Sequence, residues 1–150
     1  MSRLQLALNV PDIDEAVGFY SKLFATKPNK RKPGYANFAI ADPPLKLVLF
    51  EQAGADSRLN HLGVEVVSTD EVVAHQARLT EGGVATVEEN GTCCYARQDK
   101  VWVADPAGNR WEVYTVLNDI DDEDDHPHVE SACCTPTADD ADACCVGSER

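Results

Sequence analysis

The chain has 150 residues, enough for one domain with its own core, and a formal net charge of −13. The acidity is uneven: residues 1–117 carry 15 acidic and 12 basic side chains, whereas residues 118–150 carry 11 acidic and 1 basic. A nearly neutral body excludes the basic surface that nucleic-acid binding requires. The strongest apolar run, LKLVLF, is far shorter than the ~20 residues of a membrane helix, and no export signal is recognisable. We therefore expect a cytoplasmic protein with reduced thiols and with neither a nucleic-acid nor a membrane partner.

The first third of the chain predicts a strand, a helix and two further strands. The apolar pattern of QLALNV (5–10) indicates the first strand, and Asp12 can cap the helix that follows. Lys-Arg-Lys at 30–32 then predicts an exposed basic loop. YANFAI (35–40) and LKLVLFE (45–51) predict two antiparallel strands joined by an Ala-Asp-Pro-Pro turn.

The same order of elements returns 56 residues later along the chain. HLGVEV (61–66) matches the first strand, and Ser68 with Glu71 forms a capping-box pattern at the start of a second helix. Three further strands are predicted after it, at 92–96, 99–105 and 110–116. Because both the order of elements and the Ala-Asp-Pro turns match, the sequence predicts an internal duplication.

The duplication predicts an α+β domain at 1–117, built from two related modules of about 1–52 and 58–117. Residues 118–150 hold few large apolar side chains and many acids. Such a segment cannot bury enough surface to offset its chain entropy. We expect a disordered, acidic C-terminal tail.

Three equivalent positions of the two modules carry potential metal ligands. Gln5 and His61 occupy the same place on the first strand of each module, and Glu112 lies on the last strand of the second. Aligning the two Ala-Asp-Pro turns makes Leu47 the equivalent of Glu112, so the fourth position is apolar. An imidazole, a carboxylate and an amide oxygen suit a divalent metal such as Fe(II), and three ligands leave open positions. The alternative is a structural His61, a Gln5 that binds only water, and a Glu112 that faces solvent by strand alternation.

All six cysteines occur as adjacent pairs. Adjacent Cα atoms lie ~3.8 Å apart, less than the roughly 4.4–6.8 Å that disulfides prefer, so a pair can bond internally only under strain. Two neighbouring thiolates can instead hold one soft, thiophilic centre between them. For Cys93 and Cys94 this requires a loop or bulge, for which residues 89–91 (Glu-Asn-Gly) supply turn chemistry. The alternative is that one of the two packs in the core. The tail pairs can capture soft-metal ions or be passive thiols: Cys133, Cys134, Cys144 and Cys145.

The two-module pattern resembles the vicinal oxygen chelate superfamily, which includes glyoxalases, bleomycin-resistance proteins and extradiol dioxygenases. Within it, five stretches closely resemble the group of organoarsenical carbon–arsenic lyases and cadmium-induced proteins: MSRLQLALNV, KRKPGYANFAIADPPLKLVLFE, LNHLGVEV, TCCYARQDKVWV and DPAGNRWEVYT. The resemblance implies paired βαβββ modules and a non-haem Fe(II) site at Gln5, His61 and Glu112. It also implies a trivalent-arsenic site at Cys93 and Cys94. Extradiol relatives generally present a histidine where this chain has Gln5, which argues against ring cleavage.

The resemblance implies an Fe(II)- and O2-dependent lyase that cleaves the carbon–arsenic bond of methylarsenite and trivalent aromatic arsenicals, releases arsenite and gives arsenic resistance. Two alternatives stay open. A non-catalytic cadmium- or arsenic-binding protein would depend on its thiols and tolerate replacement of His61 or Glu112. A glyoxalase-like isomerase would need no oxygen and would tolerate loss of Cys93 and Cys94, but Leu47 removes a ligand that such sites commonly use. A homodimer is compatible with the sequence, which does not decide it.

Overall fold

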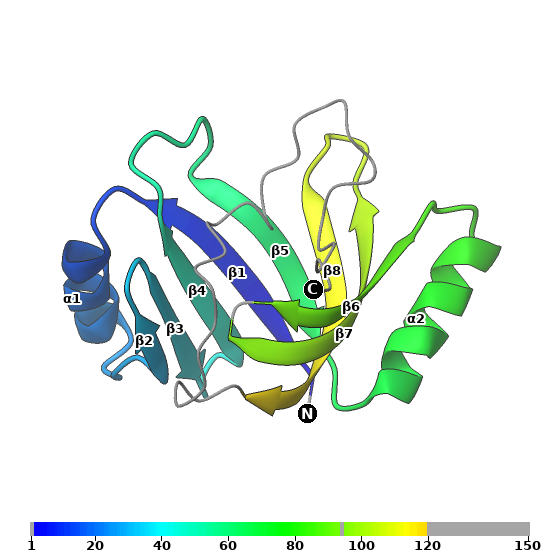
Figure 1. The fold of residues 1–150 in the computed structure, drawn as a ribbon, viewed down its shortest axis with the longest axis horizontal. Helices are drawn as coiled ribbons and strands as arrows, with labels where there is room; N and C mark the ends of the chain where they lie inside the picture. The colour runs from blue at the N-terminus through cyan, green and yellow to red at the C-terminus, as the bar shows by residue number, and fades with distance from the viewer. Residues whose placement is uncertain (1, 94, 120–150) are drawn as a thin grey trace, which may run out of the picture.

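The computed structural model describes residues 2–93 and 95–119, which form two helices and eight strands (Figure 1). In chain order these are β1 (Arg3–Val10), α1 (Ile13–Leu23), β2 (Lys30–Lys32), β3 (Tyr35–Ile40), β4 (Leu45–Glu51), β5 (Leu59–Glu65), α2 (Thr69–Glu81), β6 (Val87–Cys93), β7 (Ala96–Ala104) and β8 (Arg110–Asp119). The predicted disordered tail lies outside the described residues, apart from residues 118 and 119, which end β8. Neither helix in the described ranges is long and apolar enough to cross a membrane.

The strands form one mixed sheet in the order β2-β3-β4-β1-β5-β8-β7-β6. At its centre β1 and β5 run antiparallel, and each lies parallel to the last strand of its own module, β4 or β8. The half β1-α1-β2-β3-β4 and the half β5-α2-β6-β7-β8 are therefore related by a pseudo-twofold axis between β1 and β5. The predicted paired βαβββ architecture is confirmed.

Both helices begin where the sequence predicts. Asp12 Oδ1 accepts a hydrogen bond from Glu15 N at 2.9 Å, and Ser68 Oγ accepts one from Glu71 N at 3.3 Å. Each cap satisfies one of the backbone N–H groups that the first helical turn leaves without an intrahelical partner.

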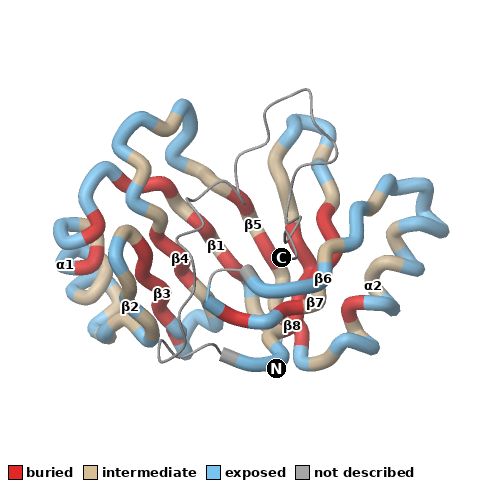
Figure 2. The backbone as a smooth tube through the Cα atoms, viewed as in Figure 1, coloured by how far each residue is buried: buried red, intermediate tan, exposed pale blue. Residues whose placement is uncertain are grey.

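Each helix covers the outer face of one end of the sheet, and the two helices lie at opposite ends in Figure 1. Ile13 and Val17 of α1 pack on the apolar side chains of β3 and β4, among them Phe38 and Leu49. The smaller second cluster joins α2 to β7 and β8 through four buried valines: Val66, Val72, Val101 and Val113. In Figure 2 the buried residues lie mainly along the strands, whereas the residues on the outer sides of both helices are exposed. The opposite, concave face of the sheet is thus left for a site.

Two sequence predictions about loops were wrong. Residues 30–32 form the edge strand β2, which pairs with β3, instead of an open basic loop. Residues 89–91 lie inside β6 and pair with β7, because the extended hairpin offers their backbone regular ladder partners. The turn of this hairpin falls after Cys93, where Tyr95 adopts a left-handed backbone conformation with φ 63°.

Candidate active site

Three polar side chains meet on the concave face of the sheet, at its centre. Gln5 projects from β1, His61 from β5 and Glu112 from β8, which are neighbouring strands. Only 5%, 4% and 3% of these residues, respectively, is exposed. Burying three polar groups together is costly unless they are paired, so their convergence has to be explained by their mutual contacts or by a ligand.

Their side-chain heads lie within contact distance of one another. Gln5 Nε2 is 3.0 Å from His61 Nε2 and donates to Glu112 Oε1 at 2.5 Å, while His61 Nε2 lies 3.2 Å from the same oxygen. The amide oxygen of Gln5 faces the other way and accepts a hydrogen bond from Tyr114 Oη. The alternative in which Glu112 faces solvent is excluded by its burial.

Two asparagines orient the His61 ring through its Nδ1 atom, on the side away from Gln5 and Glu112. Its Nδ1 lies 2.6 Å from Asn60 Oδ1, and Asn60 Nδ2 in turn donates to Asn9 Oδ1 at 2.8 Å. Because an amide oxygen only accepts, the imidazole donates to it through Nδ1, a tautomer assigned from these contacts. Nε2 then faces Gln5 and Glu112: it donates to Glu112 Oε1 when both ring nitrogens carry a proton, and it offers a lone pair to a ligand when only Nδ1 does.

Glu112 is held as a carboxylate by two neighbours. Burial by itself would raise the pKa of Glu112, but the hydrogen bond with His61 and the positive charge of Lys100 outweigh it and lower the pKa from 4.5 to about 2. Lys100 Nζ lies 3.1 Å from Glu112 Oε2, and both side chains are 4% exposed. Apart from this ion pair, Oε2 has no hydrogen-bond partner among the described atoms. The carboxylate therefore keeps acceptor capacity for a ligand.

Gly63 allows Gln5 and Glu112 to approach each other. It pairs with Gln5 on β1 and with Glu112 on β8, so it lies between them in the sheet. A Cβ at this position would lie 3.0 Å from Glu112 Cγ and 3.3 Å from Gln5 Cβ. Gly63 was not among the residues predicted from the sequence, although an isolated glycine inside a predicted strand is a signal of close approach.

The apolar fourth position is Val48, and its prediction as Leu47 was wrong by one residue. Ala7 of β1 pairs with Val48 just as Gly63 of β5 pairs with Glu112, so Val48 is the equivalent of Glu112. Leu47 points to the opposite face and belongs to the core under α1. A shift of one residue moves a side chain to the other face of the sheet. Turns of different length cannot be aligned to within one residue, so their alignment did not give the register.

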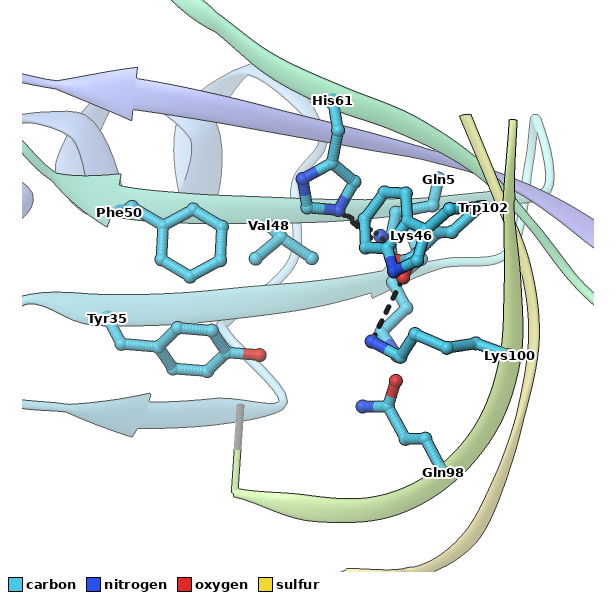
Figure 3. Close-up of a pocket in the computed structure, with 10 residues that line it drawn as sticks. Gln5, Tyr35, Lys46, Val48, Phe50, His61, Gln98, Lys100 and Trp102 are labelled. Carbon is cyan, nitrogen blue, oxygen red and sulfur yellow. Dashed lines mark hydrogen bonds and ion pairs between the residues drawn. The ribbon is translucent and has the colours of Figure 1, made fainter. Parts of the chain in front are cut away.

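A small pocket opens beside Gln5, His61 and Glu112, with aromatic rings along its wall (Figure 3). The Trp102 ring lies edge-on to His61 at 5.3 Å between centroids, and the Phe50 ring lies 6.4 Å from His61 on another side. The remaining lining residues come from both modules: Tyr35, Lys46, Val48, Gln98 and Lys100.

The hairpin that carries the central cysteine pair reaches across to the first module. Cys93 ends β6, opposite Ala96, whereas Cys94 and the four tail cysteines lie outside the described residues. Next to them, the Tyr95 ring packs 5.5 Å from the Tyr35 ring, and Lys30 Nζ donates to the Tyr95 carbonyl at 2.9 Å. The hairpin tip is therefore fixed against β2 and β3 at the Tyr35 end of the pocket.

Comparison with known proteins identifies the family. Residues 3–113 match the Glyoxalase/Bleomycin resistance protein/Dioxygenase superfamily. The chain belongs to this superfamily. It is 58% identical to a protein of Thermomonospora curvata named trivalent organoarsenical cleaving enzyme, over 99% of both chains. It is 67% identical to the cadmium-induced protein CadI of Mycobacterium bovis, over 79% of both chains. The fold is also that of homoprotocatechuate 2,3-dioxygenase from Arthrobacter globiformis, with TM-score 0.56 and 21% identity over 78% of this chain and 36% of that one.

In this glyoxalase-superfamily chain, the buried donor set fits a divalent metal. The described residues hold no group of three or more His, Cys, Asp or Glu side chains able to bind one, because the third donor is the amide of Gln5. Turning that amide over would direct its oxygen toward His61 and Glu112, and Tyr114 Oη could then accept from the nitrogen. An imidazole nitrogen with two oxygens suits a first-row ion such as Fe(II) better than a thiophilic one.

Proposed function

We propose that this protein is an Fe(II)-dependent lyase that uses dioxygen to cleave the carbon–arsenic bond of trivalent organoarsenicals and releases arsenite. The observation that carries the proposal is the convergence of Gln5, His61 and Glu112 within 3.2 Å of one another in a buried pocket. The reaction and substrate come from the relative named trivalent organoarsenical cleaving enzyme, at 58% identity over 99% of both chains.

In this proposal Gln5, His61 and Glu112 hold the iron, which supplies a site where dioxygen can be activated. The protein's own part is to keep these donors in the required state. Asn60 sets the tautomer of His61, and Lys100 keeps Glu112 ionised. The Phe50 and Trp102 rings beside His61 would limit the access of water to the carbon–arsenic bond.

Cys93 and Cys94 would hold the arsenic through two thiolates, leaving its organic group in place. Their hairpin is anchored beside the pocket through Tyr95 and Tyr35, which supports a role in bringing substrate to the site. Holding the substrate in reach lowers the entropic cost of the reaction. The tail cysteines would have an accessory role in soft-metal capture. Reduced thiols are required throughout, which favours the cytoplasm as the place of action.

The second candidate is a cadmium- or arsenic-binding protein without catalysis. It is favoured by the three cysteine pairs and by the 67% identity to a protein named cadmium-induced. It does not explain why Gln5, His61 and Glu112 converge in a buried pocket. A glyoxalase-like isomerase ranks lower, because Val48 stands where the pseudo-twofold axis would place a second carboxylate.

The test is arsenic speciation after anaerobically purified, Fe(II)-loaded protein meets methylarsenite, with and without air. We expect oxygen-dependent release of arsenite, lost in His61→Ala and in Cys93→Ser/Cys94→Ser. His75→Ala, at a histidine of α2 that does not line the pocket, and Cys144→Ser/Cys145→Ser are the matched controls and should keep activity. Iron-bound wild-type protein that releases no arsenite in air would refute the lyase and favour the metal-binding alternative.

A further inference from the structure

The two halves of the pocket occupy equivalent positions but differ in chemistry. The ladder registers pair Val48 with Ala7 and Phe50 with Asn9 in the first module, as they pair Glu112 with Gly63 and Tyr114 with Glu65 in the second. Phe50 is therefore the equivalent of Tyr114. Across the next ladder, Tyr35 opposite Phe50 is the equivalent of Lys100 opposite Tyr114. The ion pair of Glu112 and Lys100 in the second module thus has the apolar Val48 and the aromatic Tyr35 as its counterparts in the first.

The apolar half forms a continuous wall from the metal-site candidate to the cysteine hairpin. The Phe50 ring lies 6.4 Å from the His61 ring and 5.6 Å from the Tyr35 ring, which in turn contacts Tyr95 at 5.5 Å. Val48 and Tyr35 are 4% and 5% exposed and belong to one apolar cluster with Phe50 packed against it. The Tyr35 hydroxyl accepts from Asn37 Nδ2 at 2.9 Å, so its polar end is already satisfied.

The polar half is a poor place for a hydrocarbon group. Lys100 and Glu112 form a buried ion pair, and placing an apolar group against them would remove more of their solvation without any compensating contact. The apolar half carries no such cost and offers aromatic faces, which favour contact with a second aromatic ring.

We propose that Tyr35, Val48 and Phe50 bind the organic substituent of the arsenical, and that Phe50 and Val48 set the preference among uncharged alkyl and aryl groups. This inference rests on the proposed function, because it takes Cys93 and Cys94 as the holders of the arsenic. The hairpin is anchored by Tyr95 at the Tyr35 end of this wall, so the wall offers a path for the substituent from the hairpin along Tyr35 and Phe50 toward His61. Arsenite, which has no carbon, makes no use of this subsite.

The test measures binding and needs no metal. In a full-length chain with all four tail cysteines replaced by serine, Cys93 and Cys94 are the remaining thiols. Equilibrium dialysis of the metal-free protein against phenylarsenite, methylarsenite and arsenite then gives three affinities. We expect Phe50→Ala to weaken phenylarsenite binding ~10-fold or more, methylarsenite binding less, and arsenite binding not at all. Val48→Phe should fill the subsite and also weaken phenylarsenite binding, with methylarsenite and arsenite retained.

Phe19→Ala removes an exposed ring of α1 and is the matched control for Phe50→Ala. Unchanged arsenite binding shows in each variant that the hairpin and the fold are intact. If both pocket variants keep the wild-type ratio of phenylarsenite to arsenite affinity, the inference is wrong, even where the wild type releases arsenite from methylarsenite. If the ratio falls in both variants but the iron-loaded wild type releases no arsenite, the subsite stands and the proposed lyase fails.

Discussion

Replacing Gly63 by alanine tests whether close packing of Gln5 against Glu112 builds the site. The added carbon would lie 3.0 Å from Glu112 Cγ and 3.3 Å from both Gln5 Cβ and the Glu112 carbonyl oxygen. Favourable carbon contacts lie at ~3.5–4.0 Å, so the neighbouring atoms have to move away by a few tenths of an ångström. One of the three contacts is with backbone, which cannot rotate away. Overpacking of this kind costs ~1–3 kcal/mol of unfolding free energy.

The same displacement should separate the metal donors. We expect Fe(II) affinity to fall ~10–100-fold, the range found when groups that support metal ligands are altered. Urea unfolding gives the stability change, and anaerobic Fe(II) titration gives the affinity. Gly54→Ala is the matched control, because a Cβ at this exposed position has no atom within 4 Å and should change neither quantity. A Gly63→Ala protein with wild-type stability and Fe(II) affinity would refute the packing argument.

Two further predictions concern a charge and a helix cap. Lys100→Gln removes the positive charge that helps to lower the pKa of Glu112 to about 2, so that pKa should rise because burial remains. As the pH is lowered, Fe(II) binding should then be lost at a higher pH than in the wild type, which anaerobic Fe(II) titrations at a series of pH values would show. If both proteins lose Fe(II) at the same pH, Lys100 does not lower the pKa of Glu112. In the wild type, the lowered pKa contributes stability above about 4.5 that is lost as pH falls toward about 2. Asp12→Ala should cost ~1 kcal/mol in urea unfolding by removing the α1 cap, with Fe(II) affinity unchanged; a loss of affinity would show that α1 is coupled to the site.

The internal repeat made the architecture and the site candidates readable from the sequence. Two copies of one pattern imply a pseudo-twofold axis, and that axis makes the Gln5 and His61 positions equivalent. Glu112 stood out because a carboxylate inside an apolar strand has to be paired or face solvent. Both helix caps were equally readable, because capping depends on residues within a single turn.

Sequence reasoning failed where strand pairing decides the outcome. The equivalent of Glu112 was placed at Leu47 because the turns were aligned, whereas the ladder places Val48 there. Residues 89–91 have the composition of a turn, yet long-range pairing with β7 holds them extended. Propensity is a weak prior where a partner strand supplies a full set of hydrogen bonds.

The sequence by itself determined the repeat, the helix starts and three polar residues at positions that a pseudo-twofold axis brings close. Only the tertiary structure decided that Gly63 separates Gln5 from Glu112, that Lys100 pairs with Glu112, and that the Tyr95 hairpin tip lies on Tyr35. The physical reason is register. Repeats and caps are patterns that can be read along the chain, whereas the face and the neighbours of a strand residue are set by pairing with segments far away in the sequence. A shift of one residue in that pairing moves a side chain from the face that packs in the core to the face that carries the site.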